Sequence, residues 1–122
     1  MPKILIVEDE KTLAEMYSDY FEKKGYEVVC AGNVSLSLEA VKEESPDIIL
    51  LDILLPGRSG IEFLSELRDL EDQEGSEIPI IAFSNYDDSE TREKAFKFGV
   101  KDYIIKTNST PSKILEIVEN YI

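Results

Sequence analysis

Histidine is absent from this sequence of 122 residues, and cysteine occurs once, at Cys30. Without histidine the chain can form neither a Ser-His or Cys-His catalytic pair nor a histidine-ligated zinc site. A single cysteine excludes an internal disulfide and is typical of a reducing compartment. No apolar run approaches the roughly 20 residues that span a bilayer, and no signal peptide is visible. We therefore expect a cytoplasmic protein without a membrane segment.

Positive charge is also scarce. The chain has 13 lysines and arginines against 26 aspartates and glutamates, for a formal net charge of −13. It lacks the electrostatic attraction that nucleic acids and anionic membranes require, so we expect neither as a direct partner. Most of this acidity is attributed to solubility, and a share is available for a metal site. The length fits one domain, predicted to span residues 1–122 with no output domain.

Short apolar segments alternate with helical patterns along the chain. Five segments predict β-strands, at residues 3–7, 27–31, 48–52, 78–83 and 102–105. The third is the most informative, because four consecutive apolar residues precede Asp52. Such a run indicates a strand that is buried on both faces, as in a parallel sheet.

Helical patterns fill the first two gaps between these segments. The first predicted helix covers residues 10–24 and stops before Gly25, a residue that commonly follows a helix end. Its apolar side chains repeat at helical spacing and form one face: Leu13, Met16, Tyr17, Tyr20 and Phe21. The second helix carries Val34, Leu38 and Val41 and closes at Ser45-Pro46.

Three further helices follow the later strands. Ser59 and Glu62 have the spacing of a capping box, and the helix they begin buries Phe63, Leu64 and Leu67. An acidic loop is predicted from about Glu71 to Glu77, and Asp87 and Glu90 suggest the next helix, which stops at Gly99. Thr110 is an N-cap before Pro111, and the last apolar face is Ile114, Leu115, Val118 and Tyr121. The alternation and the right-handed crossover rule favour a five-stranded, doubly wound parallel α/β sheet.

Reactive side chains follow four of the five strands. Glu8-Asp9-Glu10 comes after the first strand, Asp52 ends the third, Ser84 follows the fourth and Lys106 the fifth. In a parallel sheet these strand ends lie on one edge, which is where ligands bind in open α/β folds. Each residue alone has an ordinary explanation as a cap, a helix first turn or a solvated end. Their convergence makes a functional site the better interpretation.

Carboxylates held close together repel one another and favour a bound cation. A ligand set of oxygens without histidine or cysteine suits Mg²⁺, with Mn²⁺ as the alternative. Mg²⁺ often joins carboxylates to a phosphate, which indicates phosphoryl chemistry with Asp52 as the nucleophile. Lys106 would then neutralise the phosphoryl oxygens, and the Ser84 hydroxyl would donate a hydrogen bond to one of them.

These motifs resemble the receiver domains of two-component response regulators, the CheY-like family. The matching pieces are residues 6–9, residues 51–60, Ser84 and residues 99–106, so the resemblance covers essentially the whole chain. It implies a (βα)5 flavodoxin-like fold with strand order 2-1-3-4-5. It also implies a signalling switch rather than an enzyme, one that catalyses only its own phosphorylation and slow dephosphorylation.

The resemblance further implies individual roles. Asp52 would accept a phosphoryl group from a histidine kinase or phosphotransfer protein. Asp9 would ligate Mg²⁺, with Glu8 acting through water and the backbone carbonyl of Leu54 as a further ligand. Tyr103 matches an aromatic position that turns inward when the Ser84 loop closes. This would alter the face made by the fourth helix, fifth strand and fifth helix, where a downstream protein would dock on a monomer or weak dimer.

Two departures from the family pattern bear on these expectations. Thr107 stands where the family usually has a proline after a cis peptide. A cis bond before threonine costs roughly 2.5–4 kcal/mol, so the loop after Lys106 is predicted to be trans and differently shaped. Leu54 and Tyr86 occupy positions that influence access of water to the phosphoryl group. Both are bulky and lack an acid or amide, which predicts slow self-dephosphorylation.

Other functions compete with the switch. The chain could be a pseudo-receiver, an interaction module that does not depend on phosphorylation. A phosphatase of the haloacid-dehalogenase type would need a second aspartate at position 54, where the sequence has Leu54. A flavin-binding protein of similar topology would need a hydroxyl- or glycine-rich loop after the first strand, and Glu8-Asp9-Glu10 repels phosphate there.

Some residues in these motifs also have simpler structural explanations. Pro56-Gly57 and Gly60 are interpreted first as turn formers, and Tyr103 could be an ordinary half-exposed tyrosine on an edge strand.

Overall fold

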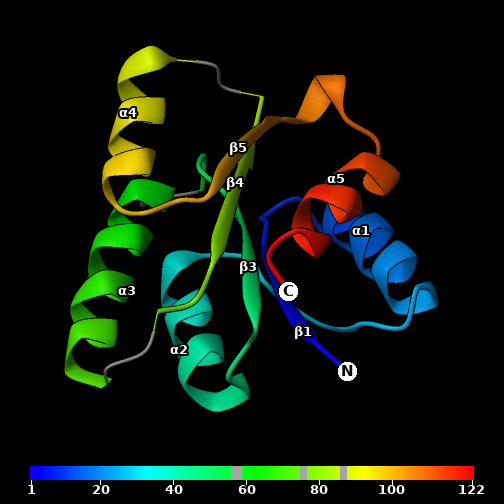
Figure 1. The fold of residues 1–122 in the computed structure, drawn as a ribbon, viewed down its shortest axis with the longest axis horizontal. Helices are drawn as coiled ribbons and strands as arrows, with labels where there is room; N and C mark the ends of the chain where they lie inside the picture. The colour runs from blue at the N-terminus through cyan, green and yellow to red at the C-terminus, as the bar shows by residue number, and fades with distance from the viewer. Residues whose placement is uncertain (56–58, 75–76, 86–87) are drawn as a thin grey trace.

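A computed structural model describes residues 1–55, 59–74, 77–85 and 88–122, and of residues 71–74 it describes the backbone only. Strands and helices alternate throughout these ranges (Figure 1). The strands are β1 (Lys3–Val7), β2 (Glu27–Ala31), β3 (Ile48–Asp52), β4 (Ile80–Ser84) and β5 (Asp102–Ile105). The helices are α1 (Lys11–Lys23), α2 (Val34–Glu44), α3 (Gly60–Glu74), α4 (Ser89–Lys97), the 3₁₀ helix η1 (Lys106–Asn108) and α5 (Pro111–Glu119).

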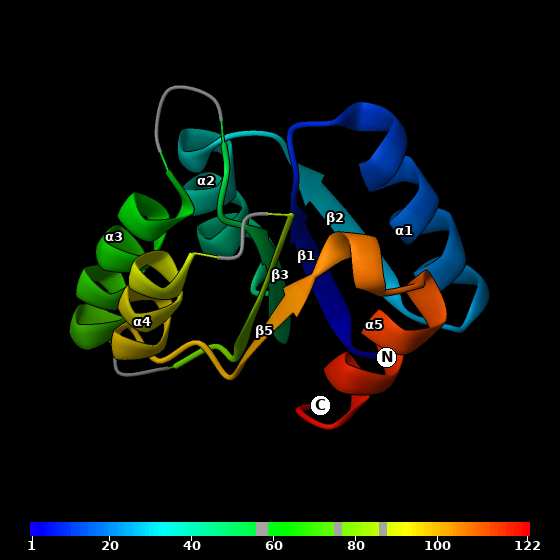
Figure 2. The ribbon, with the colours of Figure 1, turned by 90° about the horizontal axis from the view of Figure 1, so that it is seen from above.

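The five strands form one parallel sheet in the order β2-β1-β3-β4-β5, which confirms the predicted fold. Helices α2, α3 and α4 cover one face of the sheet, and α1 and α5 cover the other (Figure 2). Alternate residues of each central strand therefore enter two different cores. In β3, for example, Leu51 packs toward α2 and α3, and Leu50 packs toward α1 and α5. All five residues of β3 and of β4 are buried.

The predicted caps of two helices are observed: Ser59 Oγ accepts from the Glu62 N–H, and Thr110 Oγ1 accepts from the Lys113 N–H. Helix α2 has a cap that the sequence analysis did not predict, the Asn33 side chain, which accepts from the Leu36 N–H. These side chains satisfy backbone donors that have no partner within the helix. Gly25 lies in the left-handed region at φ 97°, as expected for a residue that ends a helix.

Other boundaries differ from prediction. Helix α3 continues to Glu74, through the start of the predicted loop, because glutamate and glutamine are good helix formers even in an acidic run. Strand β4 begins at Ile80, since Pro79 has no N–H to donate to the ladder. The side chain that caps α4 is Asp88, which accepts from the Thr91 N–H, while Asp87 lies outside the described residues.

The predicted inner face of α1 is wrong at one position. Met16 is 45% exposed, and the buried side chains of this helix are Ala14, Tyr17 and Phe21. The stripe that packs on the sheet is therefore rotated toward Ala14, which a pattern of large apolar residues does not reveal. No helix in the described ranges combines the length and the apolar character needed to cross a membrane.

Candidate functional site

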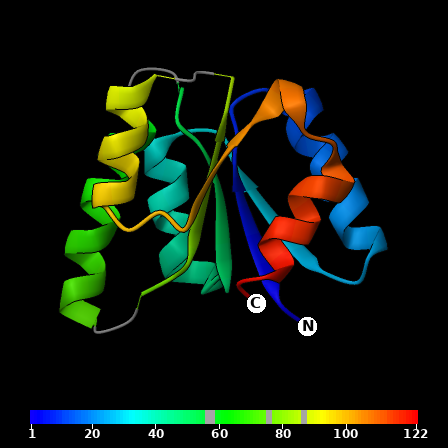
Figure 3. The ribbon, with the colours of Figure 1, turned by 45° about the horizontal axis from the view of Figure 1, so that its top comes forward.

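The register of the sheet aligns the residues that follow its strands. Leu51 pairs with Val7, Asp52 with Phe83, and Ser84 with Ile105. Glu8 and Asp9 directly follow Val7, and Lys106 directly follows Ile105. Figure 3 shows the ends of β1, β4 and β5 at the upper edge of the molecule, with both chain termini at the lower edge. The predicted convergence of side chains is therefore present.

Asp52 is nearly buried and both of its carboxylate oxygens accept hydrogen bonds. The Leu54 N–H donates to Oδ1 at 3.0 Å, and Lys106 Nζ donates to Oδ2 at 3.0 Å. The contact with Leu54 shows that Asp52 does stabilise the loop that follows it. Asp52 also pairs with Lys106, which follows β5, and β5 is separated from β3 by β4. A residue that only stabilised its own loop would not need this second contact.

Lys106 lies at the centre of the site. Besides Asp52, its Nζ donates to Glu8 Oε1 at 3.2 Å and to Oε2 at 3.1 Å, and it lies 4.8 Å from the centre of the Phe83 ring. The lysine reaches the carboxylates even though Thr107 follows it. Residues 106–108 form the 3₁₀ helix η1, and no peptide bond of the described ranges is cis. The expected trans geometry after Lys106 is confirmed.

The charges in this site shift each other's proton affinity. Burial raises the pKa of Glu8 from 4.5 to about 8, assisted by the neighbouring Asp52 and opposed by Lys106. Burial also works to lower the pKa of Lys106, but Asp52 and then Glu8 outweigh it, so the pKa of this lysine lies above its usual value. Lys106 therefore holds its proton and its positive charge. The Glu8 carboxyl instead favours its neutral, protonated form unless further positive charge lies nearby.

The donor set suits a divalent cation. One oxygen from each of Glu8, Asp9 and Asp52 lies within 4.8 Å of the others. When ionised, these three carboxylates carry three negative charges and Lys106 supplies one positive charge. A divalent ion compensates the remaining two, and oxygen ligands alone match the preference of Mg²⁺ or Mn²⁺. Burial, and then the neighbouring Asp52, raise the pKa of Glu8, so the cluster by itself favours a neutral Glu8 carboxyl.

Ser84 and Tyr103 lie on β4 and β5, the two strands beyond β3 in the sheet. Ser84 is fully buried at the last position of β4. Tyr103 is 5% exposed, so the interpretation of a half-exposed edge tyrosine is wrong. The guanidinium of Arg92, on α4, lies 5.4 Å from the centre of the Tyr103 ring. This contact covers a ring that an edge strand alone would leave open to solvent.

The sequence analysis did not predict how two residues, Phe83 and Gly60, shape this site. Phe83 provides the aromatic face beneath Lys106, and its place directly before Ser84 in the strand was the available signal. A Cβ atom at Gly60 would lie 2.8 Å from both the Asp52 carbonyl oxygen and Ile53 Cα. Gly60 therefore lets α3 start close to the end of β3, and its N–H donates to the Ile53 carbonyl at 2.7 Å. Residues Pro56, Gly57 and Tyr86 lie outside the described ranges.

A five-stranded parallel sheet that gathers carboxylates and a lysine at its carboxyl edge defines a class of domain with an acidic pocket that suits a cation. A comparison with known protein families shows which family within this class the chain belongs to. The model of the response regulator receiver domain matches residues 4–119, and the chain belongs to this family. Members of the family are generally signalling modules, not enzymes, and are generally partners of histidine kinases.

Solved structures of the family superimpose closely. A CheY-like receiver domain protein from Methanospirillum hungatei has 27% identity and a TM-score of 0.89, with 98% of this chain and 92% of that chain covered. The BeF3-activated receiver domain of RstA from Klebsiella pneumoniae has 30% identity and a TM-score of 0.84, covering 98% and 97%. A response regulator from Burkholderia pseudomallei with a phosphorylated aspartic acid, a calcium ion and citrate has 25% identity and a TM-score of 0.83, covering 94% and 65%.

Proposed function

We propose that this domain is a phosphoacceptor switch of a two-component system or phosphorelay, with Asp52 as the acceptor. The observation that carries the proposal is the 3.0 Å contact between Asp52 Oδ2 and Lys106 Nζ beside the carboxylates of Glu8 and Asp9. In this proposal Asp52 is the nucleophile, Lys106 is the fixed cation, and Glu8 and Asp9 are cation ligands. The similar structure that holds a phosphorylated aspartic acid and a calcium ion supports the same chemistry here.

The transfer step is a substitution at phosphorus. An oxygen of Asp52 forms the new O–P bond, and the P–N bond to the partner's histidine breaks and leaves the neutral or protonated imidazole on the partner. Lys106 neutralises charge on the phosphoryl oxygens, and Ser84 donates a hydrogen bond to one of them. The Leu54 N–H, already bonded to Asp52 Oδ1, orients the carboxylate.

Asp9, Glu8 and Asp52 would hold Mg²⁺, or Mn²⁺ in its place. When bound, the ion supplies positive charge for the phosphoryl oxygens, which the single lysine cannot match alone. The carbonyl of Leu54 is proposed as an additional ligand. Because burial raises the pKa of the Glu8 carboxyl to about 8, binding of a cation there would favour release of its proton.

The phosphorylated domain is proposed to signal in the cytoplasm, through contact with a protein on the α4–β5–α5 face. Tyr103 is the proposed relay, because it lies on β5 and contacts Arg92 of α4. We expect slow self-dephosphorylation. The apolar Leu54 side chain, 54% exposed beside the acceptor, provides no acid or amide to position water.

The test is incubation with acetyl phosphate and Mg²⁺, followed by intact mass measurement. We expect a single phosphoryl adduct that is absent in Asp52→Asn. The matched control is Asp47→Asn, which changes the aspartate directly before β3, at the opposite end of the strand from Asp52; there Asp47 Oδ2 accepts from the Lys3 N–H at 2.7 Å. This variant should form the adduct normally. No adduct on the wild-type domain would overturn the proposal and favour the phosphorylation-independent interaction module.

A further inference from the structure

Lys106 crosses one strand of the sheet to reach Asp52. Strand β4 lies between β3 and β5, so two strand spacings, about 9–10 Å, separate the strand that ends at Asp52 from the strand that precedes Lys106. Lys106 Nζ nevertheless lies 3.0 Å from Asp52 Oδ2. Its side chain therefore extends over the carboxyl end of β4, and the residue of β4 at this level can hold the lysine in place.

Phe83 is the residue of β4 that lies beneath this crossing. It pairs with Asp52 in the parallel ladder, and its ring enters the core formed with α1 and α5. Ile104 enters the same core, so Lys106, two residues further along, extends on that face as well. As a result, Lys106 Nζ lies 4.8 Å from the centre of the Phe83 ring.

The Phe83 ring is fixed by its neighbours. It is fully buried, and the ring of Tyr17, on α1, packs against it edge-on with 5.5 Å between the ring centres. Phe21 stacks on Tyr17 at 6.2 Å, so the support continues along α1. Burial raises the pKa of the Tyr17 hydroxyl and the charge of Lys106 opposes this rise, which agrees with the short distance between these rings and the lysine. Phe83 therefore offers the ammonium a stationary surface.

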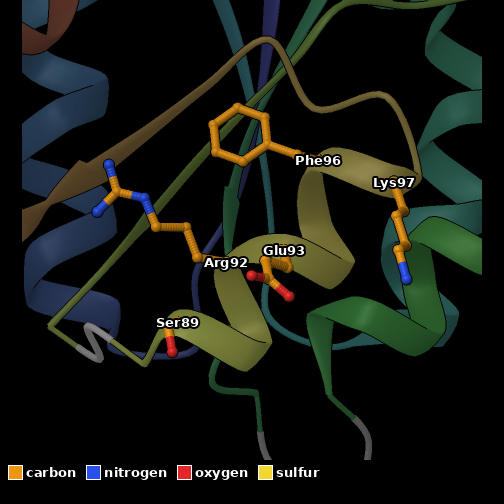
Figure 4. Close-up of a pocket in the computed structure, with 5 residues that line it drawn as sticks. All are labelled: Ser89, Arg92, Glu93, Phe96 and Lys97. Carbon is orange, nitrogen blue, oxygen red and sulfur yellow. The ribbon is translucent and has the colours of Figure 1, made fainter.

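Two other cation–ring contacts in the described ranges lie at the surface of the molecule. Lys24 Nζ lies 5.5 Å from the centre of the Tyr20 ring, and Lys24 is exposed. The Arg92 guanidinium lies 5.4 Å from the centre of the Tyr103 ring, but Arg92 is exposed and lines a surface cleft of α4, where water competes with the ring (Figure 4). The Lys106 side chain is only 12% exposed, and a ring attracts a cation more strongly when the cation is desolvated.

An aliphatic side chain at position 83 would fill the core without serving the lysine in this way. A charged ammonium that lies against hydrocarbon loses the water that stabilises it and gains no electrostatic attraction in return. The face of an aromatic ring carries negative charge density, so it offsets part of this loss. The ring is also a much weaker acceptor than the carboxylates of Glu8 and Asp52, so it does not draw Nζ away from them. The aromatic character of Phe83 therefore matters in addition to its volume.

We propose that Phe83 is a positioning residue whose ring holds the Lys106 ammonium beside Asp52 for phosphoryl transfer. Without the ring, the flexible four-carbon stem of the lysine would sample arrangements in which Nζ lies away from the phosphoryl oxygens. A stabilising charge accelerates a reaction only when it is held where the charge of the transition state develops. The inference rests on the proposed function for the reaction and adds how the cation of that reaction is held.

The test replaces Phe83 with phenylalanines that carry one, two or three fluorine atoms on the ring, introduced by nonsense suppression. Fluorine withdraws electrons from the ring face and weakens its attraction for a cation, with little change in the size of the ring. The rate of adduct formation with acetyl phosphate and Mg²⁺, measured by intact mass, should fall with each added fluorine. Phe83→Leu should be slower than the wild type by about 3- to 30-fold, the factor expected for the loss of a partly desolvated cation–ring contact.

Phe63 is the matched control, because it is also fully buried but lies in the other core, on α3. The same fluorine series at Phe63, and Phe63→Leu, should leave the rate unchanged. Urea denaturation of all variants measures the loss of packing, which we expect for leucine at both positions. Equal rates across the series at Phe83, or an equal fall across the series at Phe63, would overturn the inference.

The mobility of the Lys106 side chain provides a second measurement that does not require phosphorylation. In the domain without Mg²⁺, NMR relaxation of the Lys106 Cε group should report a more mobile side chain in Phe83→Leu and an unchanged one in Phe63→Leu. Unchanged mobility in Phe83→Leu would overturn the inference even if the rate fell. A wild-type domain that forms no adduct would contradict the proposed function, and the mobility of Lys106 would then decide by itself whether Phe83 holds the lysine.

Discussion

The two ends of the sheet each hold a lysine surrounded by carboxylates. At one end, the Lys3 cluster joins Lys3 Nζ to Glu44 Oε2 at 3.1 Å and to Glu27 Oε2 at 3.6 Å. At the other, the Lys106 cluster joins Lys106 Nζ to Glu8 at 3.1 Å and to Asp52 at 3.0 Å. The distances and the chemical groups are nearly the same.

Burial distinguishes the two clusters. The carboxylate side chains of Glu27 and Glu44 are 58% and 43% exposed, whereas those of Glu8 and Asp52 are 1% and 6% exposed. Water screens the first set, so its ion pairs contribute little. In the second set desolvation strengthens every charge interaction and raises the pKa of Glu8 to about 8. Equivalent contacts can thus be weak surface ion pairs at one end and a buried, strongly interacting cluster at the other.

Replacing the two lysines should give the largest contrast. Lys106→Met removes the fixed cation from Asp52, and we expect phosphorylation by acetyl phosphate to slow on the order of 10²–10³-fold, as when one preorganised stabilising group is lost. Lys3→Met should leave the rate unchanged. The measurement is the rate of adduct formation by intact mass at saturating Mg²⁺. An unchanged rate in Lys106→Met would remove the functional distinction between the clusters.

Gly60 tests how tightly the Asp52 end is packed. In Gly60→Ala the new Cβ meets backbone atoms at 2.8 Å, so α3 must move from β3, and we expect a loss of about 1–3 kcal/mol in the free energy of unfolding. Gly32→Ala is the control, because its Cβ would lie 3.8 Å from the nearest atom, the Glu8 carbonyl oxygen. Urea denaturation measures both. Equal stability of the two variants would show that the close approach at Gly60 is easily relieved.

The raised pKa of Glu8 predicts a pH dependence confined to the buried cluster. A carboxyl whose pKa is higher in the folded state stabilises the fold below its unfolded value, 4.5, and this contribution is lost as pH rises through about 8. In EDTA, the urea concentration at the midpoint of unfolding should therefore fall between pH 4.5 and about 8, and it should fall more steeply for the wild type than for Glu8→Gln. Saturating Mg²⁺ should reduce the difference, because the cation favours the charged carboxylate. Parallel pH profiles of the two proteins would contradict the assignment to Glu8.

The smallest effect is expected at the exposed end. Lys3→Met should change neither Mg²⁺ affinity nor the slope of stability against pH over the range in which Glu8 titrates, because its partners Glu27 and Glu44 are exposed to water. Isothermal titration with Mg²⁺ and urea denaturation measure the two properties. An effect on Mg²⁺ binding comparable to that of Glu8→Gln would mean that the two ends of the sheet are coupled.

Strand ends were more predictable than helix faces in this chain. Asp52, Ser84 and Lys106 were recognised because apolar runs stop at them, and the parallel sheet then aligns them with little freedom. The face of α1 was mispredicted at Met16, since which flank of a helix meets the sheet depends on packing with α5 and on the sheet twist. The limits of α3 and β4 likewise depended on local competition between helix propensity and the missing N–H of Pro79.

The sequence by itself determined the alternation of strands and helices, the acidic and basic groups at one edge of the sheet and the absence of histidine chemistry. These follow from local patterns, because periodicity and strand direction fix which residues end on which edge. Only the tertiary structure decided that Lys106 contacts both Glu8 and Asp52, that Phe83 lies beneath it and that Arg92 covers Tyr103. Those relations join residues far apart in the chain, and burial, which gives their charges their strength, exists only once the layers have packed together.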